Sequence, residues 1–392
     1  MQNGAANGQS GSKKDWLCDF PWTYLYVSVQ GEVSFCCTNT PKRGSLREQT
    51  FEEIWNGFGF QLARSQFRDR RYIPAKCLPS CQWLIANIPS HAASFGANSK
   101  PVYDDAGEQK RYQGQIRATG PLASPKNFVE NLELQRRDIA AESSITAAMP
   151  TRAHIEIIQS CNLFCNFCDI GVNRPHESFI DDIVLDRLKP AYRYLRQVEL
   201  LGGEIFSVGI ERSPLRRILQ DIQEATKDNP EPVETLLVTN AVALGSKWAD
   251  FLTSLANIKL NISVSIDTLD PVAYPKMRVG GKLAKTLENV RALKRLADDR
   301  KYKLNLIFTS VLCDLTYRSI PQIVEFAQEM DAGYVMLQPL QKTGDHAFYD
   351  EHNLFTAERK ESVVELKDIL DSLSYERLNK ANILTICNHY LA

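Results

Sequence analysis

Three closely spaced cysteines give this chain its clearest chemical signal. Cys161, Cys165 and Cys168 close the stretch HIEIIQSCNLFCNFCDI, and no fourth cysteine lies nearby. Three thiols in so short a segment favour a metal site over a disulfide. Structural zinc is usually closed by four protein ligands, whereas an iron–sulfur cubane with three protein thiolates leaves one iron open to another ligand. The spacing therefore favours an iron–sulfur cluster, with a zinc knuckle as the alternative.

Two further patterns lie where strands are expected to end. Gly202, Gly203 and Glu204 end the stretch QVELLGGE, and Ser265 lies in ISVSID. Glycines let the backbone approach a ligand closely, and a carboxylate suits an ammonium group. Each pattern alone is common in ordinary turns and strands, so their order after the cysteines is what makes them informative.

The spacing and order of these motifs over residues 150–345 resemble the radical S-adenosylmethionine (SAM) superfamily. The resemblance implies that Cys161, Cys165 and Cys168 are the catalytic cysteines and hold a 4Fe-4S cluster whose open iron binds SAM. In this family one electron from the cluster cleaves a C–S bond, and the resulting 5′-deoxyadenosyl radical takes a hydrogen atom from the substrate. The chemistry belongs to the cofactor, and the protein supplies position, redox tuning and exclusion of water.

The same resemblance assigns residues around SAM. Phe167, the aromatic residue before the third cysteine, would lie near the adenine, and Gly202, Gly203 and Glu204 match the GGE motif that meets the SAM ammonium. Ser265 would bind the SAM ribose or carboxylate.

Arg278 and Asn240 complete the implied site. Arg278 would pair with the SAM carboxylate, a task for which arginine is well suited, and a solvated arginine is the alternative. Asn240 would help to order the site, although a helix cap explains it equally well. Thr268 and Ala241 stand where many family members carry glycine.

A second set of cysteines precedes the first. Cys18, Cys36, Cys77 and Cys81 resemble, together with the residues between them, the SPASM auxiliary-cluster module or its shorter twitch form. The resemblance implies one further 4Fe-4S cluster, with Cys37 able to replace Cys36, and electron transfer as its role. Two departures stand out: there are cysteines for one cluster only, and the module precedes the core instead of following it. Four cysteines also suit tetrahedral zinc, which stays open as the alternative.

The strands and helices that must position these residues are expected from residue 151 to the end of the sequence. Strand-like and helix-like stretches alternate there, which predicts a parallel sheet with crossover helices. We expect an α/β fold, a (β/α)6 partial TIM barrel preceded by a small cysteine-rich α+β auxiliary-cluster domain. Ligands in such folds bind at the carboxyl ends of the strands. The predicted strands are 152–159, 197–203, 233–242, 258–267, 303–313 and 333–341.

The domain layout predicted from composition has four parts. Residues 1–15 read as a disordered tail, 16–83 as the auxiliary-cluster domain, 84–150 as a linker with one helix near 126–140, and 151–392 as the radical SAM core. Within the second part, alternation around Gln30-Gly31 predicts a hairpin, and the stretch 45–67 reads as a helix.

Bulk composition excludes several classes of partner. The 392 residues are 44% hydrophobic and 24% charged with a net charge of −1, so no broad basic field points to nucleic acid. No apolar run suits a bilayer span, and the polar N-terminus lacks the apolar core of a signal peptide. We therefore expect no membrane contact and a cytoplasmic location.

The leading hypothesis is a radical SAM enzyme that abstracts hydrogen from a peptide or a carbohydrate-type small molecule. An electron donor such as flavodoxin or ferredoxin would be its partner. The alternative is a non-catalytic iron–sulfur or zinc protein that binds or transfers electrons. No general acid or base can be chosen, since Asp169, Asp267 and Tyr274 near the motifs have ordinary structural explanations. Cys313 and Cys387 read as small buried residues.

Overall fold

A nine-stranded sheet organises the described part of the chain, in the order β3-β2-β1-β4-β5-β6-β7-β8-β9. The computed structural model describes residues 18–37, 41–69, 110–117, 120–121 and 124–391. Cys77, Cys81 and the tail predicted for residues 1–15 lie outside the described residues. The strands are β1 Tyr24–Val27, β2 Glu32–Ser34, β3 Gly44–Ser45, β4 Arg152–Ile158, β5 Gln197–Gly202, β6 Val233–Thr239, β7 Ile258–Ser265, β8 Leu304–Leu312 and β9 Tyr334–Pro339.

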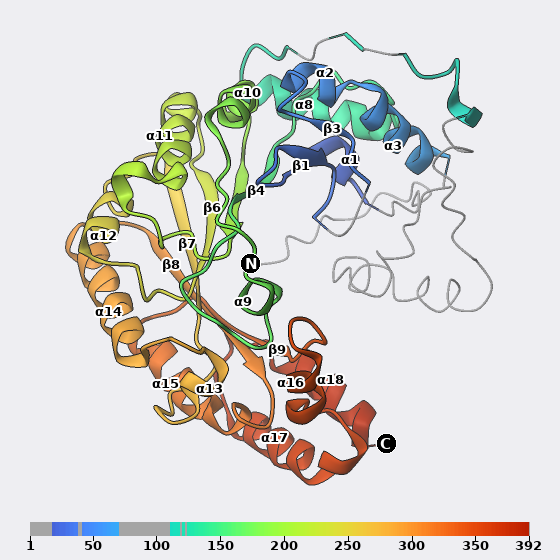
Figure 1. Cartoon of the computed structure of the whole chain (residues 1–392). Coiled ribbons are helices and arrows are strands. Elements are labelled where there is room, and N and C mark those ends of the chain that lie inside the picture. The colour runs from blue at the N-terminus through green and yellow to red at the C-terminus, as the bar shows by residue number, and fades with distance from the viewer. Residues whose placement is uncertain (1–17, 38–40, 70–109, 118–119, 122–123, 392) are drawn as a thin grey trace.

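The six predicted core strands are confirmed. β4 to β9 pair in sequence order and are all parallel, which is the arrangement expected of a partial (β/α)6 barrel. Helices between them cover the outer face of the curved sheet (Figure 1). The helices are α1 Phe20–Thr23, α2 Phe51–Trp55, α3 Phe58–Arg68, α8 Phe128–Ala140, α9 Asp169–Asn173, α10 Asp182–Tyr192, α11 Pro214–Thr226, α12 Ser246–Leu252, α13 Tyr274–Met277, α14 Leu283–Asp299, α15 Ile320–Glu329, α16 His346–His352, α17 Lys360–Ser372 and α18 Lys380–Leu391, with short 3-10 turns at Ile210–Arg212, Tyr317–Ser319 and Ala357–Arg359.

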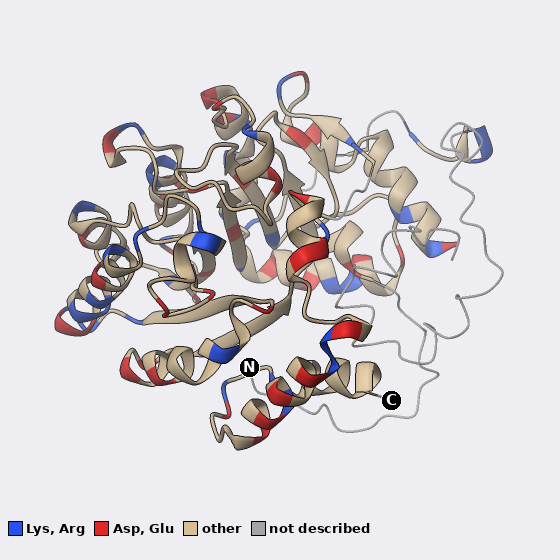
Figure 2. Cartoon of the chain, turned by 60° about the horizontal axis from the view of Figure 1, so that its bottom comes forward, with Lys and Arg blue, Asp and Glu red and all other residues tan. Residues whose placement is uncertain are grey.

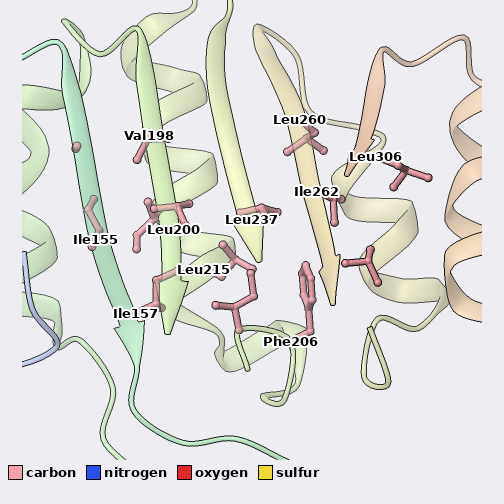
Figure 3. Close-up of a cluster of buried hydrophobic side chains, with 14 of the residues drawn as sticks. Ile155, Ile157, Val198, Leu200, Phe206, Leu215, Leu237, Leu260, Ile262 and Leu306 are labelled. Atoms are coloured by element: carbon pink, nitrogen blue, oxygen red, sulfur yellow. The ribbon is translucent and has the colours of Figure 1, made fainter. Parts of the chain in front are cut away.

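The main core lies between the sheet and these outer helices. Alternate side chains of each strand point into it, because successive residues of a strand face opposite sides. Figure 3 shows this cluster, in which side chains from β4 to β8 meet Phe206 and Leu215. The other face, called here the inner face, carries polar residues of these strands, among them His154, Glu199 and Asn261. The apolar strand pattern thus decides which residues remain available for chemistry.

The predicted N-terminal hairpin is confirmed, and it extends the core sheet. β1 pairs antiparallel with β2 and parallel with β4. Gly31 has φ +79° at the turn, a conformation that glycine adopts without strain. The described part of the predicted auxiliary domain therefore lies on the β4 edge of the same sheet, while the domain boundaries themselves stay a prediction.

The stretch 45–67, predicted as one helix, contains two. α2 ends before Asn56, and α3 begins after Gly57. The Asn56 side chain donates to the carbonyls of Pro121 and Thr146 at 3.0 and 2.8 Å. These contacts with distant residues hold Asn56 between the two helices. The periodicity of the sequence alone does not reveal this interruption. The predicted helix near 126–140 is confirmed as α8.

Charged residues of both signs are interspersed along the described helices and loops (Figure 2). In the part of the chain that the structure describes, no helix is both long and apolar enough to cross a bilayer.

Candidate functional site

The cysteine loop, defined here as residues 159–168, leaves the carboxyl end of β4 and leads into α9. Cys165 is buried, while Cys161 and Cys168 are partly exposed. The amide of Leu163 donates to the Cys161 sulfur at 3.4 Å, and the amide of Cys168 donates to the Cys165 carbonyl at 3.2 Å. Short turns of this kind bring the three thiols of one loop to the same edge of the sheet.

The end of β5 holds the first half of the loop. The amide of Gly203 donates to the carbonyl of Ile158, and that of Glu204 donates to the carbonyl of Ser160, both at 2.9 Å. A Cβ atom on Gly203 would lie 2.0 Å from the Ser160 carbonyl oxygen. Only glycine therefore permits this approach, so the predicted Gly-Gly-Glu sequence has a demonstrable packing role against the cysteine loop.

Glu204 is wholly buried and links β5 to the end of β6. Its carboxylate accepts from the Thr239 hydroxyl at 2.7 Å, from the Asn240 amide at 2.7 Å and from the Phe206 amide at 3.2 Å. Burial raises the pKa of Glu204, and the three hydrogen bonds oppose that rise. The carboxylate thus fixes the neighbouring strand end, and its contact with SAM stays a prediction.

Asn240 reaches the cysteine loop from the end of β6. Its amide nitrogen donates to Asn162 Oδ1 at 2.8 Å and lies 3.9 Å from the Cys161 sulfur. Its own side-chain oxygen accepts from the Val242 amide at 3.0 Å. Ala241 has φ +58° here, so the turn keeps a conformation typical of glycine although alanine occupies it. Asn240 therefore joins the turn after β6 to the loop.

Arg278 forms a buried ion pair with Asp267. Arg278 Nε lies 2.8 Å from Asp267 Oδ2, and Asp267 Oδ1 also accepts from the Val311 amide at 3.0 Å. Burial alone would lower the pKa of Arg278, but Asp267 beside it holds that pKa above its usual range. The Arg278 guanidinium also lies 5.5 Å from the centre of the Phe167 ring. Its pairing with the SAM carboxylate, expected from sequence, stays a prediction.

Ser265 ends β7 on the inner face, since its neighbour Val264 points into the core. Two residues earlier, the Ser263 hydroxyl lies 2.8 Å from that of Thr309 on β8. Asn305 donates to Asn261 at 2.7 Å one step further along the same two strands. The inner face between β7 and β8 is therefore lined by paired hydrogen-bonding groups that suit a polar ligand.

The segment after β9 also contacts the cysteine loop, and sequence reasoning missed it. Residues 343–345 donate three hydrogen bonds to residues 166–169 at 2.8 to 2.9 Å. The only sequence signal was Gly344 in KTGD, which reads as an ordinary turn.

The donor set of the loop fits an iron–sulfur cluster. Burial raises the pKa of the Cys165 thiol to about 11 and also raises that of Cys161, and a metal that coordinates a thiol deprotonates it. Among the described residues, no three His, Cys, Asp or Glu side chains converge closely enough to hold one metal ion. A cubane spreads its cysteine ligands over several irons. Three thiols in one loop match a cubane that takes three protein thiolates, whereas structural zinc is usually closed by four protein ligands.

The described cysteines of the N-terminal set lie at the opposite edge of the sheet. Cys18 accepts from the Phe20 amide at 3.4 Å just before α1. Cys36 follows β2 and lies level with the start of β1, which pairs with the start of β4. Since β4 rises by about 3.3 Å per residue, roughly 20 Å of strand separates this edge from the cysteine loop. The two cysteine sets therefore lie at opposite ends of β4.

A polar row crosses the inner face between these two ends, and no sequence motif indicated it. Tyr26, His154 and Glu199 occupy paired positions on β1, β4 and β5. His154 Nδ1 lies 3.1 Å from the Glu199 carboxylate, and the His154 and Tyr26 rings are 5.3 Å apart. Imidazole and carboxylate groups are the side chains that proteins use most often for general acid–base work. The alternation in RAHIEII was the one signal available, and it shows only that His154 and Glu156 share a face.

A cavity of about 510 Å³ lies at the amino ends of the central strands, away from the cysteine loop. Its walls include Arg152, Glu234 and Lys259, which are already engaged: Arg152 pairs with Asp19 and Lys259 with Glu234, both at 2.7 Å. The cavity contains none of the residues predicted to bind SAM.

Comparison with known families matches two parts of the chain. Residues 155–327 match the family model described as the radical SAM superfamily, and residues 18–82 match that of SPASM, an iron-sulfur cluster-binding domain. The first match includes the cysteine loop, Glu204 and Arg278. The second begins at Cys18 and ends just past Cys81.

Individual proteins show more distant similarity. A probable GTP 3′,8-cyclase of Methanococcus maripaludis is 27% identical over 45% of this chain and 55% of its own length. A second protein of that name, from another strain of this organism, is 25% identical over 60% of this chain and 78% of its own. The chain thus spans about half the length of the first relative. Among solved structures, Streptococcus suis SuiB bound to precursor peptide SuiA has a TM-score of 0.46 and 18% identity, covering 70% of this chain and 59% of that one.

Proposed function

Because the chain is a member of the radical SAM superfamily with a SPASM domain ahead of its radical SAM domain, we propose that it reductively cleaves SAM and abstracts hydrogen from a peptide or carbohydrate-type substrate. The observation that carries this proposal is the support of the cysteine loop from several strand ends at once. Hydrogen bonds from the end of β5, from Asn240 after β6 and from residues 343–345 after β9 all reach it. A loop that only bound structural zinc would not need such support from the ligand-binding edge of the sheet.

The chain's own residues divide the work around the loop. Cys161, Cys165 and Cys168 would hold the 4Fe-4S cluster, which supplies with bound SAM the 5′-deoxyadenosyl radical. Gly203 allows close packing beside the loop, and Phe167 would shield the adenine from water.

The side chains proposed to bind SAM are themselves held by other residues or by their place on a strand. Arg278 would meet the SAM carboxylate from a position held by Asp267, and Ser265 would meet the ribose from the end of β7. Glu204 would meet the ammonium only if it exchanged one of its three present hydrogen bonds. Asn240 would steady the first cysteine.

The auxiliary site would accept the electron that a substrate radical gives up. Cys18, Cys36, Cys77 and Cys81 are the proposed ligands of a second 4Fe-4S cluster, as the match to an iron-sulfur cluster-binding domain supports. The proton lost in the same oxidation needs an acceptor, and the His154–Glu199 pair faces the inner side of the sheet between the two cysteine sets. Electron and proton would thus leave the substrate on the side of β1 and β4.

The polar inner face supports a substrate rich in hydroxyl or amide groups. The Asn261–Asn305 and Ser263–Thr309 pairs offer both donors and acceptors there. The curated relatives named GTP 3′,8-cyclase make GTP, a nucleoside triphosphate with a ribose, a natural first probe, and peptides are the second class. We further propose a cytoplasmic location, an electron donor such as flavodoxin or ferredoxin, and the division at residues 16–83, 84–150 and 151–392.

Anaerobic reconstitution followed by iron counting and dithionite-driven SAM cleavage tests the proposal. About eight irons per chain with release of 5′-deoxyadenosine are expected for two cubane clusters. Replacing Cys161, Cys165 and Cys168 together by alanine should abolish cleavage, while Cys387→Ala, a buried cysteine outside both sets, should not. Cleavage that survives the triple change would exclude the assigned cluster.

The alternative, a non-catalytic iron–sulfur or zinc protein, predicts a different result in the same experiment. The reconstituted chain would then bind no SAM at equilibrium, and a zinc site would load without iron. About four irons with intact SAM cleavage would keep the enzyme and reduce the N-terminal set to a structural metal site.

A further inference from the structure

The segment between β9 and α16 contacts the second half of the cysteine loop through consecutive residues. Residues 342–345 are called here the strap. The Thr343 hydroxyl donates to the Phe167 carbonyl at 2.9 Å, and the Gly344 amide donates to the Asp169 carboxylate at 2.8 Å. The Asp345 amide donates to the carbonyl of residue 166 at 2.8 Å. Three consecutive residues thus hold the part of the loop that runs from Cys165 to α9.

The strap also fits the loop sterically. Gly344 has φ +64°, and a Cβ atom built on it would lie 2.7 Å from the Asn166 carbonyl oxygen and 2.8 Å from the Cys168 amide. An alanine would therefore be strained by its backbone and would push against the peptide next to a proposed cluster ligand. Glycine at position 344 therefore allows both the positive φ of the turn and the close approach to the cysteine loop.

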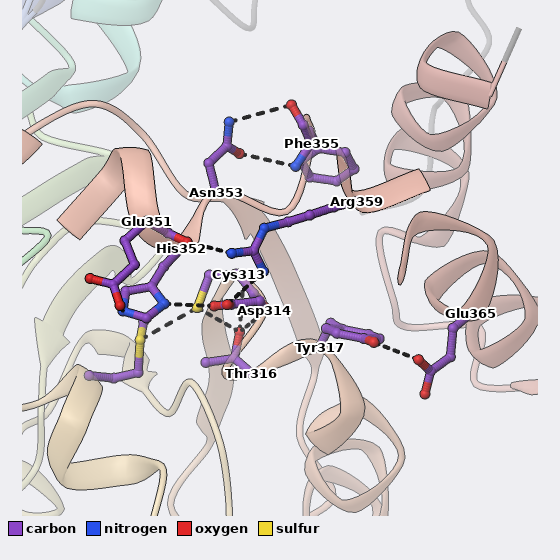
Figure 4. Close-up of polar contacts among 11 residues, drawn as sticks. Cys313, Asp314, Thr316, Tyr317, Glu351, His352, Asn353, Phe355, Arg359 and Glu365 are labelled. Atoms are coloured by element: carbon purple, nitrogen blue, oxygen red, sulfur yellow. Dashed lines mark hydrogen bonds and ion pairs between the residues drawn. The ribbon is translucent and has the colours of Figure 1, made fainter. Parts of the chain in front are cut away.

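The rest of the fold holds the strap in place. Asp345 caps α16 by accepting from the Ala347 amide at 2.9 Å. One turn later, the Phe348 ring packs 6.5 Å from the Phe167 ring. At the end of α16, His352 lies 2.9 Å from the Asp314 carboxylate, which Arg359 also contacts at 2.6 Å (Figure 4).

Resting on the proposed function, we propose that Thr343, Gly344 and Asp345 are positioning residues for the SAM-binding cluster. They fix the peptides of Asn166 and Phe167, and these peptides determine the directions of the Cys165 and Cys168 thiols. Groups that orient metal ligands without touching the metal change its affinity and its potential. The strap would therefore act on SAM binding and on the cluster spectrum through these peptides.

Four variants of the reconstituted full chain test this inference. Gly344→Ala crowds the loop, and Thr343→Val removes one donor at an exposed position while keeping the shape. Thr343→Ser restores that donor. Gly114→Ala is the matched control, because Gly114 also has a positive φ (+86°) but has no atom within 4 Å of its Cβ position.

The measurements are the iron count, the SAM dissociation constant, and the low-temperature EPR spectrum of the dithionite-reduced protein with and without SAM. We expect Gly344→Ala to weaken SAM binding by about tenfold and to diminish the SAM-dependent spectral change. Thr343→Val should weaken binding by about fivefold, whereas Thr343→Ser and Gly114→Ala should match the wild type. If Gly344→Ala fails to fold, the Thr343 pair decides alone.

Two kinds of failure are distinguishable. Wild-type protein that binds no SAM after reconstitution would overturn the proposed function, and the inference with it. Wild-type protein that binds SAM, with Thr343→Val and Gly344→Ala giving the same affinity and spectra, would overturn the strap's role alone.

Discussion

The two cysteine sets of this chain are supported in opposite ways. The loop at the carboxyl end of β4 receives hydrogen bonds from the ends of β5, β6 and β9, which come from distant parts of the chain. Of the N-terminal set, Cys18 precedes α1 and Cys36 follows β2, on a hairpin that extends the sheet through the pairing of β1 with β4. One set is embedded in the barrel and the other is added to its edge.

The difference between the two regions suggests a rule about how firmly each site must fix its metal ligands. A site that must aim a radical at one hydrogen needs its metal ligands fixed by several independent elements. A site that only accepts an electron tolerates a looser attachment. We therefore expect small changes far along the chain to disturb the cysteine loop, and changes at Cys18 and Cys36 to leave it intact.

The largest expected effect comes from Asp267→Asn, which breaks the ion pair behind the proposed SAM carboxylate site. Arg278 is only 8% exposed, so the change leaves a buried charge without its partner. We expect the free energy of unfolding to fall by about 3–5 kcal/mol, measured by chemical denaturation. Asp299→Asn, on the exposed side of α14, is the control, and equal midpoints for the two variants would show that the pair adds nothing.

Gly203→Ala should come next, because the added methyl group meets the Ser160 backbone, which cannot move aside as a flexible side chain can. Overpacking of this kind costs about 1–3 kcal/mol, and we expect iron at the cysteine loop and SAM cleavage to fall together. Gly209→Ala, with no atom within 4 Å of its Cβ position, should leave both unchanged. Wild-type SAM cleavage in Gly203→Ala would show that the cysteine loop is not fixed more tightly than the N-terminal cysteines.

Sequence patterns predicted the repeating strands well, because each core strand carries apolar residues that local alternation reveals. Ile155 and Ile157 on β4, and Val198 and Leu200 on β5, all point into the cluster of Figure 3. The edge pairing of β1 with β4 was not predicted, because two strands more than a hundred residues apart leave no local sign of pairing. The break at Asn56 escaped for the same reason, since its hydrogen-bond partners lie far along the chain.

The candidate site was predicted in its residues but not in its connections. Sequence motifs indicated Glu204 and Arg278, yet their contacts with Thr239 and Asp267 emerge only in the folded chain. The strap was missed because a Lys-Thr-Gly-Asp sequence is an ordinary turn until it is placed beside the cysteine loop. Whether these residues bind SAM stays a prediction.

Replacing Cys18 and Cys36 together by alanine tests the independence of the two regions directly. Because roughly 20 Å of strand separates Cys18 and Cys36 from the cysteine loop, we expect the iron count to fall by about half while 5′-deoxyadenosine formation without substrate continues at the wild-type rate. Iron and sulfide analysis beside SAM cleavage measures both. A parallel loss of SAM cleavage would show that the two sites depend on each other and would contradict the comparison.

The smallest expected effect lies at Glu365, which touches neither cysteine set and serves as a reference. Arg318 and then Tyr317 donate to its carboxylate and lower its pKa to about 2. A pKa below the unfolded value means that this contact stabilises the fold above pH 4.5 and that its contribution is lost as the pH falls from there toward about 2.

Glu365→Gln should therefore lower thermal stability slightly at pH 7, and its difference from the wild type should shrink as the pH is taken below 4.5. The contact is exposed to solvent, so a shift in melting temperature of more than a few degrees is not expected. Glu361→Gln, exposed on the same helix, is the control. Iron content and SAM affinity should stay unchanged in both variants at neutral pH, since neither residue belongs to the network that holds the cysteine loop. A change in SAM affinity in Glu365→Gln alone would show that this network extends through α17, further from the loop than the strap and its anchor at Asp314.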